Sequence, residues 1–427
     1  MLETSRILNF PEEIIKKLEY RGLEYSELIY KIVDLENQRK QNQSDYDSLN
    51  GEYKKLSNEI YDLSRNVSEK NDELIFDLKK KSKSCKNSID EKKKKLQSLS
   101  QEIKDILYKL PNIPHFSVPK GKSVEDNVVI HEKKFSNSLF QRKLPHWELI
   151  KNYKIIDFET GVKISGAGYP VYFGQGAKLQ RALINFLLEE ASKEGYLEVQ
   201  VPLVVNEDSA YGTGQLPDME GQMYEILNEK KYLISTSEIP LTNIYKEEFI
   251  EKKNCPIKMC SYTPCFRREA GSWGADVKGL NRLHQFDKVE LVHITTQEKS
   301  YEEMENISNF LKKTLEKLKI TYRVLNLCTY DMGSKAALQY DFEVWSEGQK
   351  KWLEVSSLSN FETYQSNRLN IKYKDEKKNK FLAHTLNASC FGIPRLMIAI
   401  LENFQEDKEI KIPEVLSDYT KFDKITF

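Results

Sequence analysis

The feature that most constrains the fold is a seam of residues spaced by threes and fours from Leu28 to Val67. No proline interrupts this stretch, so it predicts one continuous helix of roughly 60 Å at 1.5 Å rise per residue. A rod of this length with a heptad seam needs a second helix against which the seam is buried. The seam consists of Leu28, Ile32, Leu35, Arg39, Asn42, Tyr46, Leu49, Tyr53, Leu56, Ile60, Leu63 and Val67.

A second helical register follows a polar stretch, Arg65 to Asp72, that is short enough to turn the chain back. The simplest fold for two such registers is an antiparallel coiled-coil hairpin. Three prolines within nine residues end the helical pattern after Leu110. We therefore predict a helical arm over residues 1–110, a linker over 111–135 and a globular domain over 136–427. The second register consists of Leu74, Leu78, Cys85, Ile89, Leu96, Leu99, Ile103, Ile106 and Leu110.

The chain beyond the linker mixes strand-like and helix-like patterns. Runs such as KYLIST, KVELVHI and YDFEVW read as strands, whereas AKLQRALINFLLEEASKEG has apolar positions at helical spacing. A chain of 427 residues also exceeds a typical single domain. The globular part is therefore predicted to be of the α+β class.

The second helix of the arm carries nine lysines between Lys79 and Lys95, opposed there only by Asp90 and Glu91. Charge runs are common on exposed coiled-coil faces, so a solvated face is one interpretation. A contact surface for a phosphate backbone is the other. The chain has 65 basic and 65 acidic residues, so an anionic partner must be met by a local patch and not by a global positive field.

The six cysteines include no CxxC pair, and Cys255 and Cys260 lack the spacing of a zinc ribbon. Reduced, packed thiols without zinc are expected, which fits a reducing compartment. Charges are scattered through the N-terminus, and no later stretch approaches a membrane span. A cytoplasmic protein with no membrane partner is therefore predicted.

Residues suited to nucleotide chemistry gather in one segment between Cys265 and Leu291. The chain has no GxxxxGK(S/T) loop, so an ATP site must neutralise the triphosphate in another way. Guanidinium groups orient phosphates, a carboxylate accepts a base amino group, and an aromatic ring stacks on the base. Each residue alone also fits a surface ion pair or a core position, but the ordered combination predicts a nucleotide site on a strand-loop-strand hairpin. The residues are Arg267, Arg268, Glu269, Arg282 and Phe286.

The same segment, FRREAG followed by LNRLHQFDKVEL, resembles motif 2 of class II aminoacyl-tRNA synthetases in the form found in seryl-tRNA synthetases. Four further stretches are similar to this family in the same order, namely YGTGQLP, STSEIPLTN, YDFEVW with EVSSLSNFETYQSNR, and NASCFGIPRLMIAILENFQ. The resemblance spans arm, linker and body. It implies a tRNA-binding arm followed by a class II catalytic domain, built on a mainly antiparallel sheet flanked by helices.

The resemblance implies an ATP site with Arg267, Glu354 and Arg395 as catalytic residues. Arg267 would hold the α-phosphate, Glu269 the adenine amino group, and Phe286 would stack on the base. Arg395 would clasp the γ-phosphate or the adenine face. Mg2+ would be bound by Glu354 together with phosphate oxygens and Ser357. The implied ATP-binding set is Arg267, Arg268, Glu269, Phe286, Glu354, Val355, Ser356, Ser357 and Arg395.

The implied reaction is ATP-dependent activation of L-serine to seryl-adenylate, followed by transfer of serine to the 3′ end of tRNA(Ser), with tRNA(Sec) as a further candidate acceptor. Carboxylates suit the ammonium and hydroxyl of serine. A helix ending near Gly195 and the strand YLEVQVPLVV with Pro202 resemble motif 1, which implies a homodimer. The implied serine pocket consists of Thr236, Ser237, Glu238, Glu290 and Ser389.

Motif 3 departs from the family pattern, because Cys390 and Pro394 stand where glycines are common and Ala388 replaces another. Pro394 is acceptable in the first turn of a helix that begins near Arg395, where its missing N–H has no intrahelical partner. Cys390 fits a small packed position. Both departures are therefore compatible with the implied site.

In the motif 2 loop Ala275 stands where an arginine is frequent, and Lys278 or Trp273 offers a replacement contact. Two other functions are compatible with the sequence. A synthetase-like homologue could pass the activated amino acid to another acceptor, although such homologues usually lack the arm. A non-catalytic coiled-coil adaptor would be marked by loss of site residues, whereas Arg267 and Arg395 are present.

Overall fold

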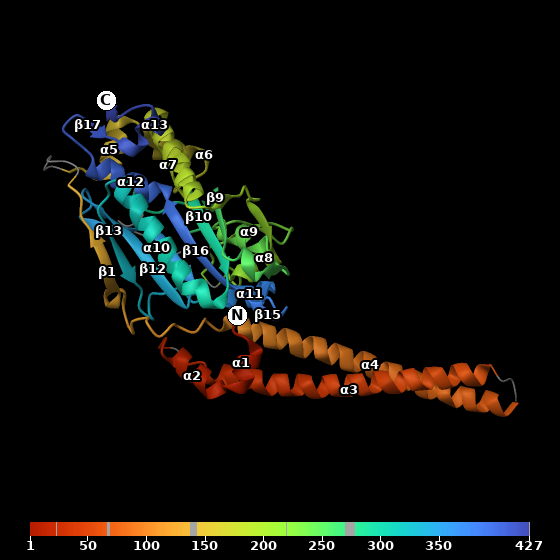
Figure 1. Ribbon diagram of the computed structural model, residues 1–427. Coiled ribbons are helices and arrows are strands. Elements are labelled where there is room, and N and C mark those ends of the chain that lie inside the picture. The colour runs from red at the N-terminus through yellow and green to blue at the C-terminus, as the bar shows by residue number, and fades with distance from the viewer. Residues whose placement is uncertain (23, 66–68, 137–142, 219, 270–277, 427) are drawn as a thin grey trace. The chain divides into compact units, whose positions relative to one another are not determined.

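The computed structural model describes residues 1–22, 24–65, 69–136, 143–218, 220–269 and 278–426 (Figure 1). Ala275 and Trp273 of the predicted motif 2 loop lie outside these residues. The chain divides into two compact units. We call Leu2–Glu19 with Leu23–Pro111 the arm unit, and Asn112–Phe427, with Met1 and Tyr20–Gly22, the body unit.

The arm unit is an antiparallel helical hairpin, as predicted. Lys31 forms an ion pair with Glu102 at 2.9 Å, and Asp45 pairs with Lys92 at 2.7 Å, so position along one helix rises as position along the other falls. Beyond the second pair, toward the turn, apolar side chains of both helices pack together, including Leu56, Leu78 and Cys85. The helices of this unit are α1 (Thr4–Asn9), α2 (Pro11–Glu19), α3 (Ser26–Ser64) and α4 (Glu69–Lys109).

The packing departs from the predicted seams at the start of each helix. At the start of α3, Leu28 is half-buried and its neighbour Ile29 is fully buried, while Tyr30 donates a hydrogen bond to Glu12 of α2 at 2.5 Å. At the start of α4, Leu74 is 49% exposed, and the packed seam of that helix begins at Leu78.

The body unit is built on an eight-stranded sheet with the order β1-β11-β12-β13-β16-β10-β9-β4. All neighbours pair antiparallel except β4 and β9, which confirms the predicted mainly antiparallel α+β fold. The strands are β1 (Val128–Lys133), β4 (Leu197–Glu198), β9 (Ile257–Phe266), β10 (Gln285–Thr295), β11 (Tyr322–Asn326), β12 (Leu338–Ser346), β13 (Lys351–Asn360) and β16 (His384–Gly392).

Long helices pack along this sheet, with α10 on β13 and β16, α12 on β10 and β12, and α7 on β9 and β10 (Figure 1). Their apolar faces and the sheet form one large core. The helices are α5 (His146–Tyr153), α6 (Phe158–Ile164), α7 (Gly174–Lys193), α8 (Glu207–Thr213), α9 (Glu238–Asn243), α10 (Ser300–Lys317), α11 (Tyr364–Leu369), α12 (Ile393–Asn403) and α13 (Ser417–Thr420).

Short strands form small sheets around the main one. They are β2 (Ile156–Asp157), β3 (Val171–Tyr172), β5 (Val204–Asn206), β6 (Tyr224–Ile226), β7 (Lys231–Leu233), β8 (Phe249–Glu251), β14 (Lys372–Lys374), β15 (Lys380–Leu382), β17 (Glu409–Lys411) and β18 (Lys424–Thr426). The strand expected in YLEVQVPLVV is thus split into β4 and β5. Pro202 lies between them and has no N–H to donate to a ladder.

Residues 112–133, within the stretch expected to be a linker, pack onto the body unit. The N–H of Asn112 donates to the Ser334 carbonyl at 2.7 Å, and that of His115 donates to the Ala337 carbonyl at 2.8 Å. β1 then pairs with β11 as an edge strand of the main sheet. Among the described residues, no helix combines the length and apolar character that a membrane crossing requires.

Alternation along the central strands sorts side chains between the core and the opposite face of the sheet. On β10, Val289 and Leu291 are buried in the core, so Phe286, Lys288 and Glu290 belong to the other face. On β16, Ala388 and Cys390 are likewise core residues, so their replacement of glycine is a packing feature. Pro394 lies in the first turn of α12, as predicted.

Candidate active site

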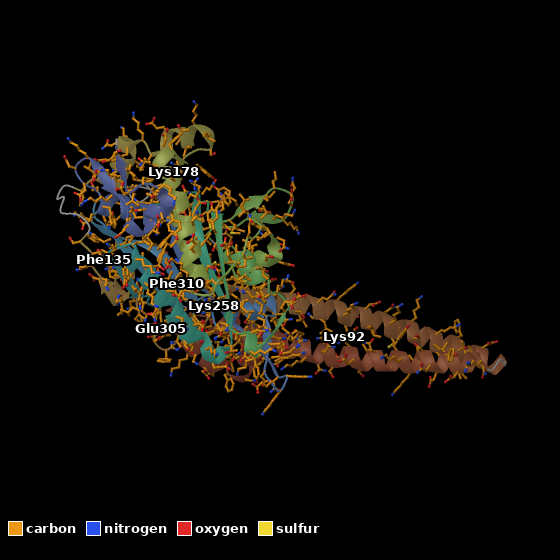
Figure 2. The ribbon with its side chains drawn as sticks, turned by 45° about the horizontal axis from the view of Figure 1, so that its top comes forward. Lys92, Phe135, Lys178, Lys258, Glu305 and Phe310 are labelled. Atoms are coloured by element: carbon orange, nitrogen blue, oxygen red, sulfur yellow. The ribbon has the colours of Figure 1, made fainter. Side chains whose placement is uncertain are left out.

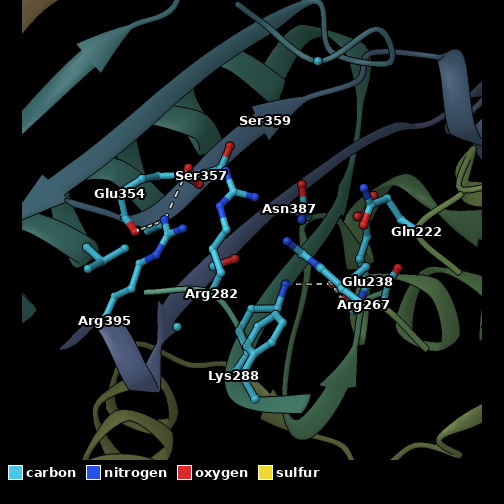
Figure 3. A pocket seen from close by; sticks show the side chains of 18 of the residues that line it. Gln222, Glu238, Arg267, Arg282, Lys288, Glu354, Ser357, Ser359, Asn387 and Arg395 are labelled. Carbon is cyan, nitrogen blue, oxygen red and sulfur yellow. Dashed lines mark hydrogen bonds and ion pairs between the residues drawn. The ribbon is translucent and has the colours of Figure 1, made fainter. Parts of the chain in front are cut away.

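A cavity of about 520 Å3 lies over the face of the sheet formed by β10, β13 and β16 (Figure 3). The structure brings together most of the residues implied by the sequence, although they come from segments separated by up to 159 positions. The predicted residues that line the cavity are Thr236, Glu238, Arg267, Glu269, Phe286, Glu354, Val355, Ser356, Ser357, Ser389 and Arg395.

Three predicted residues are not among the cavity-lining residues in the described part of the chain. Arg268 is exposed, and its backbone N–H donates to the Gln222 carbonyl at 2.9 Å. Ser237 is fully buried at the start of α9. Glu290 is also fully buried, but it forms hydrogen bonds with Thr236, Asn387 and Ser389, which line the cavity.

The motif 2 residues lie on the predicted hairpin of β9 and β10, in which Phe266 pairs with Gln285. The guanidinium of Arg267 stacks over the Phe286 ring at 5.2 Å, and its Nε donates to the Ser235 carbonyl at 3.4 Å. Glu269 forms an ion pair with Arg282 at 3.0 Å. Arg267 therefore lies between the aromatic side of the cavity and the segment that carries Thr236.

Around Glu290 the cavity has a dense polar cluster. The carboxylate accepts hydrogen bonds from Asn387 Nδ2 at 2.6 Å, Thr236 Oγ1 at 3.2 Å and Ser389 Oγ at 3.5 Å, and it forms an ion pair with Lys288. Lys288 Nζ also donates to Thr236 Oγ1 at 2.8 Å. These groups present donors and acceptors in a space that suits a small polar molecule.

Glu238 lies next to this cluster, because its backbone N–H donates to Thr236 Oγ1 at 3.2 Å. Its carboxylate accepts a hydrogen bond from Gln365 Nε2 at 2.6 Å and one from Gln215 Nε2 at 3.4 Å. Two buried carboxylates, Glu238 and Glu290, thus lie at the same end of the cavity. An ammonium group is the natural ligand for such an end.

The opposite end is formed by β13 and α12. Arg395 donates from Nη1 to the Glu354 carbonyl at 2.7 Å and from Nε to the Asn281 carbonyl at 3.2 Å. A bulge leaves Val355 without a partner on β12, and this extra residue places Glu354 on the same side of the strand as Ser357. Figure 3 shows Arg282 and Arg395 projecting into this space near Glu354.

Neighbouring groups hold Ser357 in place. Gln339 Nε2 donates to Ser357 Oγ at 2.8 Å and to the carboxylate of Asp341 at 3.2 Å. Burial, together with the nearby carboxylate of Glu354, raises the pKa of Asp341 well above its ordinary value. On the other side of the cavity, burial lowers the pKa of Lys335.

Sequence reasoning missed several cavity residues. Lys288 could have been found, because it stands two positions from Phe286 and Glu290 on the same face of one strand. Lys335, Gln339 and Asn387 had no such signal. Among the residues that the structure describes, the cationic side chains that line the cavity are Arg267, Arg282, Lys288, Lys335 and Arg395.

All six cysteines are free thiols, and five of them are buried. Within the described ranges, no cluster of three or more His, Cys, Asp or Glu side chains is arranged to hold a metal ion.

Comparison with known proteins decides the family. Residues 1–114 match the model of the seryl-tRNA synthetase N-terminal domain, and residues 223–404 match that of the class II tRNA synthetase core domain (G, H, P, S and T). A serine–tRNA ligase of Salinibacter ruber is 40% identical over 427 residues, covering 100% of this chain and 99% of the relative. The chain belongs to the seryl-tRNA synthetase family. It is a class II aminoacyl-tRNA synthetase and a serine–tRNA ligase.

Other members of the family have the same extent and fold. A serine–tRNA ligase of Pelodictyon phaeoclathratiforme is 43% identical, covering 100% of this chain and 99% of that one. The crystal structure of seryl-tRNA synthetase from Pyrococcus horikoshii complexed with ATP has a TM-score of 0.89 at 32% identity, covering 100% and 99% of the two chains. The cytoplasmic enzyme of Naegleria fowleri in complex with AMP has a TM-score of 0.85 at 24% identity, covering 100% and 99%.

Proposed function

We propose that this synthetase activates L-serine with ATP to seryl-adenylate in the described cavity and transfers serine to the 3′ end of tRNA(Ser). The observation that carries the proposal is the position of Arg267. It stacks on Phe286, next to the residues suited to a nucleotide, and it bonds Ser235, next to the residues suited to serine. The α-phosphate and the serine carboxylate must meet at such a junction for the reaction to occur.

At the nucleotide end, Phe286 stacks on the adenine and Glu269 accepts its amino group. Arg267 holds the α-phosphate, and Arg395 holds the γ-phosphate. The side chains that form this end come from the β9–β10 hairpin and from the start of α12. Arg282, which pairs with Glu269, adds a further cation within reach of the phosphates.

At the serine end, Glu290 and Glu238 share the ammonium and hydroxyl groups of the substrate. Thr236 and Ser389 are fixed by their bonds to Glu290 and complete the pocket. When serine binds, its hydroxyl pairs with polar groups of this pocket. Alanine would leave these groups unpaired, and threonine would bring an additional methyl group for which the pocket needs room.

The first step is an in-line attack of the serine carboxylate on the α-phosphorus with release of pyrophosphate. Both reactants are anionic, so most of the catalysis comes from positioning and from neutralisation of charge by the arginines. In the second step a ribose hydroxyl at the 3′ end of the tRNA attacks the mixed anhydride. The anhydride is already activated, so no side-chain nucleophile is required.

Mg2+ fits the residues present at the Arg395 end. Glu354 and Ser357 lie on one side of β13 and offer two hard oxygen donors. Two protein ligands are enough for Mg2+ when phosphate and water supply the remaining oxygens. The ion would neutralise and orient the triphosphate when bound. Glu354 and Ser357 would hold it, and Gln339 would keep Ser357 oriented.

The remaining assignments follow from the same proposal. Residues 1–110 form the tRNA-binding arm, 111–135 the connection to the catalytic part and 136–427 the catalytic domain. The lysine-rich face of α4 contacts the tRNA backbone. A second candidate acceptor is tRNA(Sec). We further propose a cytoplasmic homodimer, consistent with the free thiols and the motif 1 resemblance. A fully active monomer in sedimentation at micromolar concentration would contradict the dimer.

Serine-dependent exchange between ATP and pyrophosphate tests the first step, and charging of purified tRNA(Ser) tests the second. Exchange with serine and none with alanine or threonine is the expected result. Exchange without charging would leave the chain as an adenylate-forming homologue with another acceptor. Absence of both activities in a folded protein would favour a non-catalytic adaptor.

A further inference from the structure

A buried histidine outside the cavity wall connects two elements of the site. His146, at the start of α5, has no exposed surface, and its Nδ1 lies 2.8 Å from Glu402 Oε1 on α12. Its backbone N–H donates to the same oxygen at 2.9 Å. On the other side of the ring, Nε2 lies 2.9 Å from the backbone nitrogen of Leu280.

The hydrogen-bond partners of the His146 ring assign a donor role to one nitrogen and an acceptor role to the other. Burial raises the pKa of Glu402, but hydrogen bonds from His146 and Ser346 outweigh this effect and hold the pKa below its ordinary value. Gly348 also donates its N–H to this carboxylate at 2.9 Å. Glu402 is therefore an acceptor, so Nδ1 carries the proton and Nε2 accepts from the Leu280 N–H.

The segment held by His146 leads directly to Arg395. The carbonyl of Asn281, the residue after Leu280, accepts the hydrogen bond from Arg395 Nε. Asn281 Nδ2 donates to Gln349 Oε1 at 3.0 Å, and Gln349 Nε2 donates to Glu402 at 3.3 Å. Arg395 and Glu402 are two turns apart on α12, so this helix holds the segment at two points.

Two more contacts fit this segment to α5. A Cβ on Gly279, whose φ is +67°, would lie 2.2 Å from Nε2 of His146, so the ring occupies space that only glycine leaves open. The ammonium of Lys278 lies 4.6 Å from the centre of the Trp147 ring. His146 and Trp147 thus place residues 278–281 together.

We propose that His146 is a positioning residue for ATP, because it fixes the Leu280–Asn281 backbone against which the guanidinium of Arg395 is oriented. The inference rests on the proposed role of Arg395 at the ATP phosphates. His146 does not touch the substrates. It acts as a donor to Glu402 and an acceptor for Leu280, and the second of these bonds is the one that the mechanism needs.

Two substitutions separate these bonds. In His146→Asn the amide nitrogen can replace Nδ1 and keep the bond to Glu402, but no atom reaches Leu280. In His146→Gln the amide oxygen can replace Nε2 and accept from Leu280. We expect His146→Asn to raise the KM for ATP by roughly 10–100-fold with the KM for serine unchanged, as misplacement of a binding group does. His146→Gln should restore most of the ATP affinity.

The assay is serine-dependent ATP–pyrophosphate exchange on the full-length protein, with calorimetric binding of ATP and thermal melting as parallel measurements. An unchanged KM for ATP in both variants, or parallel losses for ATP and serine in both, would overturn the inference. If both variants fail to fold, Gln349→Leu leaves His146 in place and removes the side-chain bonds of Gln349 to Asn281 and Glu402. It should raise the KM for ATP several-fold and leave that for serine unchanged. An unaltered enzyme without exchange would instead count against the proposed function.

Discussion

The two units of this protein reach their order in opposite ways. In the arm unit the contacts recur along two antiparallel helices, with pairs such as Lys31 with Glu102 and Lys92 with Asp45 joining the same two elements. In the body unit the cavity and the contacts that support it join segments far apart in the sequence, as in the bond between His146 and Glu402 across 256 positions. In a repeating structure, repeats can be removed while the remaining ones keep their contacts. In a network of contacts between distant segments, a change of one residue affects the residues that are coupled to it.

The sharpest test of this difference is removal of the hairpin. The ion pair between Lys31 and Glu102 places residues 28 and 105 opposite one another, so a short Gly-Ser connection can replace residues 29–104. Charging of tRNA(Ser) should fall by about two orders of magnitude or more, because the phosphate contacts of the arm are lost. Serine-dependent exchange should stay within about twofold, because the described residues that line the cavity all belong to the body unit.

Both activities are measured on one preparation, with circular dichroism as the check on folding. If the shortened enzyme charged tRNA as well as the intact one, the arm would be an assembly element and its lysines a solvated face. If exchange were lost with charging, the two units would not be separable in function.

The opposite change keeps the arm and alters one buried carboxylate of the body. Glu290→Gln removes the charge that faces Lys288, Thr236 and Asn387. We expect kcat/KM for serine to fall on the order of a thousandfold, because a pocket built for a polar substrate loses its main acceptor. Binding of tRNA by the arm should remain as it is.

A matched control is Glu303→Gln, which changes another buried carboxylate that pairs with His293 and does not line the cavity. This control should keep most of the exchange activity, although it also neutralises a buried carboxylate and so shares any loss of stability that such a change causes. Comparable exchange with serine and alanine in the unaltered enzyme would contradict the assignment of the serine pocket.

The same contrast explains what could be predicted from the sequence. Heptad spacing is a local pattern, so it predicted the hairpin, and the packing departs from it only near the ends of the repeat, where Leu74 is 49% exposed. The hairpin of β9 and β10 and the polar residues on it were also local. Lys288 was accessible from strand alternation, although it was overlooked.

Other features of the site were beyond local patterns. The bulge at Val355 reverses the face of Glu354, and nothing in the alternation of β13 marks it. The partnership of His146 with Glu402 depends on how the chain closes over hundreds of residues. The roles of the residues came from the family resemblance and not from their spacing. Local sequence patterns therefore predicted individual helices and strands. The contacts between those helices and strands could be seen only in the structure.

A third test concerns the metal. Glu354→Gln should lower the rate of serine activation by about 10²-fold and shift the Mg2+ requirement to higher concentration, because it removes the only carboxylate proposed for the ion. Arg395 should stay in place, since its closer bond is to the backbone carbonyl of Glu354. The measurement is the exchange rate over a titration of Mg2+, with melting as a check.

Glu343→Gln provides the control for this change. Glu343 faces Glu354 across the strands β12 and β13, but its carboxylate pairs with Arg323 at 2.5 Å and does not line the cavity. An equal Mg2+ shift in both variants would mean that the effect is structural. Full exchange activity in Glu354→Gln would remove the residue from the proposed metal site.

The smallest expected effect distinguishes the two helices of the arm. Lys92 is labelled in Figure 2 and is tied to Asp45, so charge reversal there would disturb the hairpin itself. Lys93 and Lys94 are exposed on the same helix, and Lys54 and Lys55 are exposed on α3. Reversal of either pair to glutamate changes the net charge by the same amount. The comparison therefore separates the effect of where the lysines lie from the effect of total charge.

We expect the Lys93→Glu and Lys94→Glu pair to weaken tRNA binding by roughly 10-fold at moderate salt and to reduce the steepness of the salt dependence by about one to two phosphate contacts. The pair at Lys54 and Lys55 should have a smaller effect, because α3 lacks the lysine run of α4. Exchange should be unaffected in both. Binding is measured by filter retention over a series of salt concentrations. Equal losses for the two pairs would mean that the tRNA responds to the total charge of the arm, and the lysine-rich face of α4 would then be no more than a solvated surface.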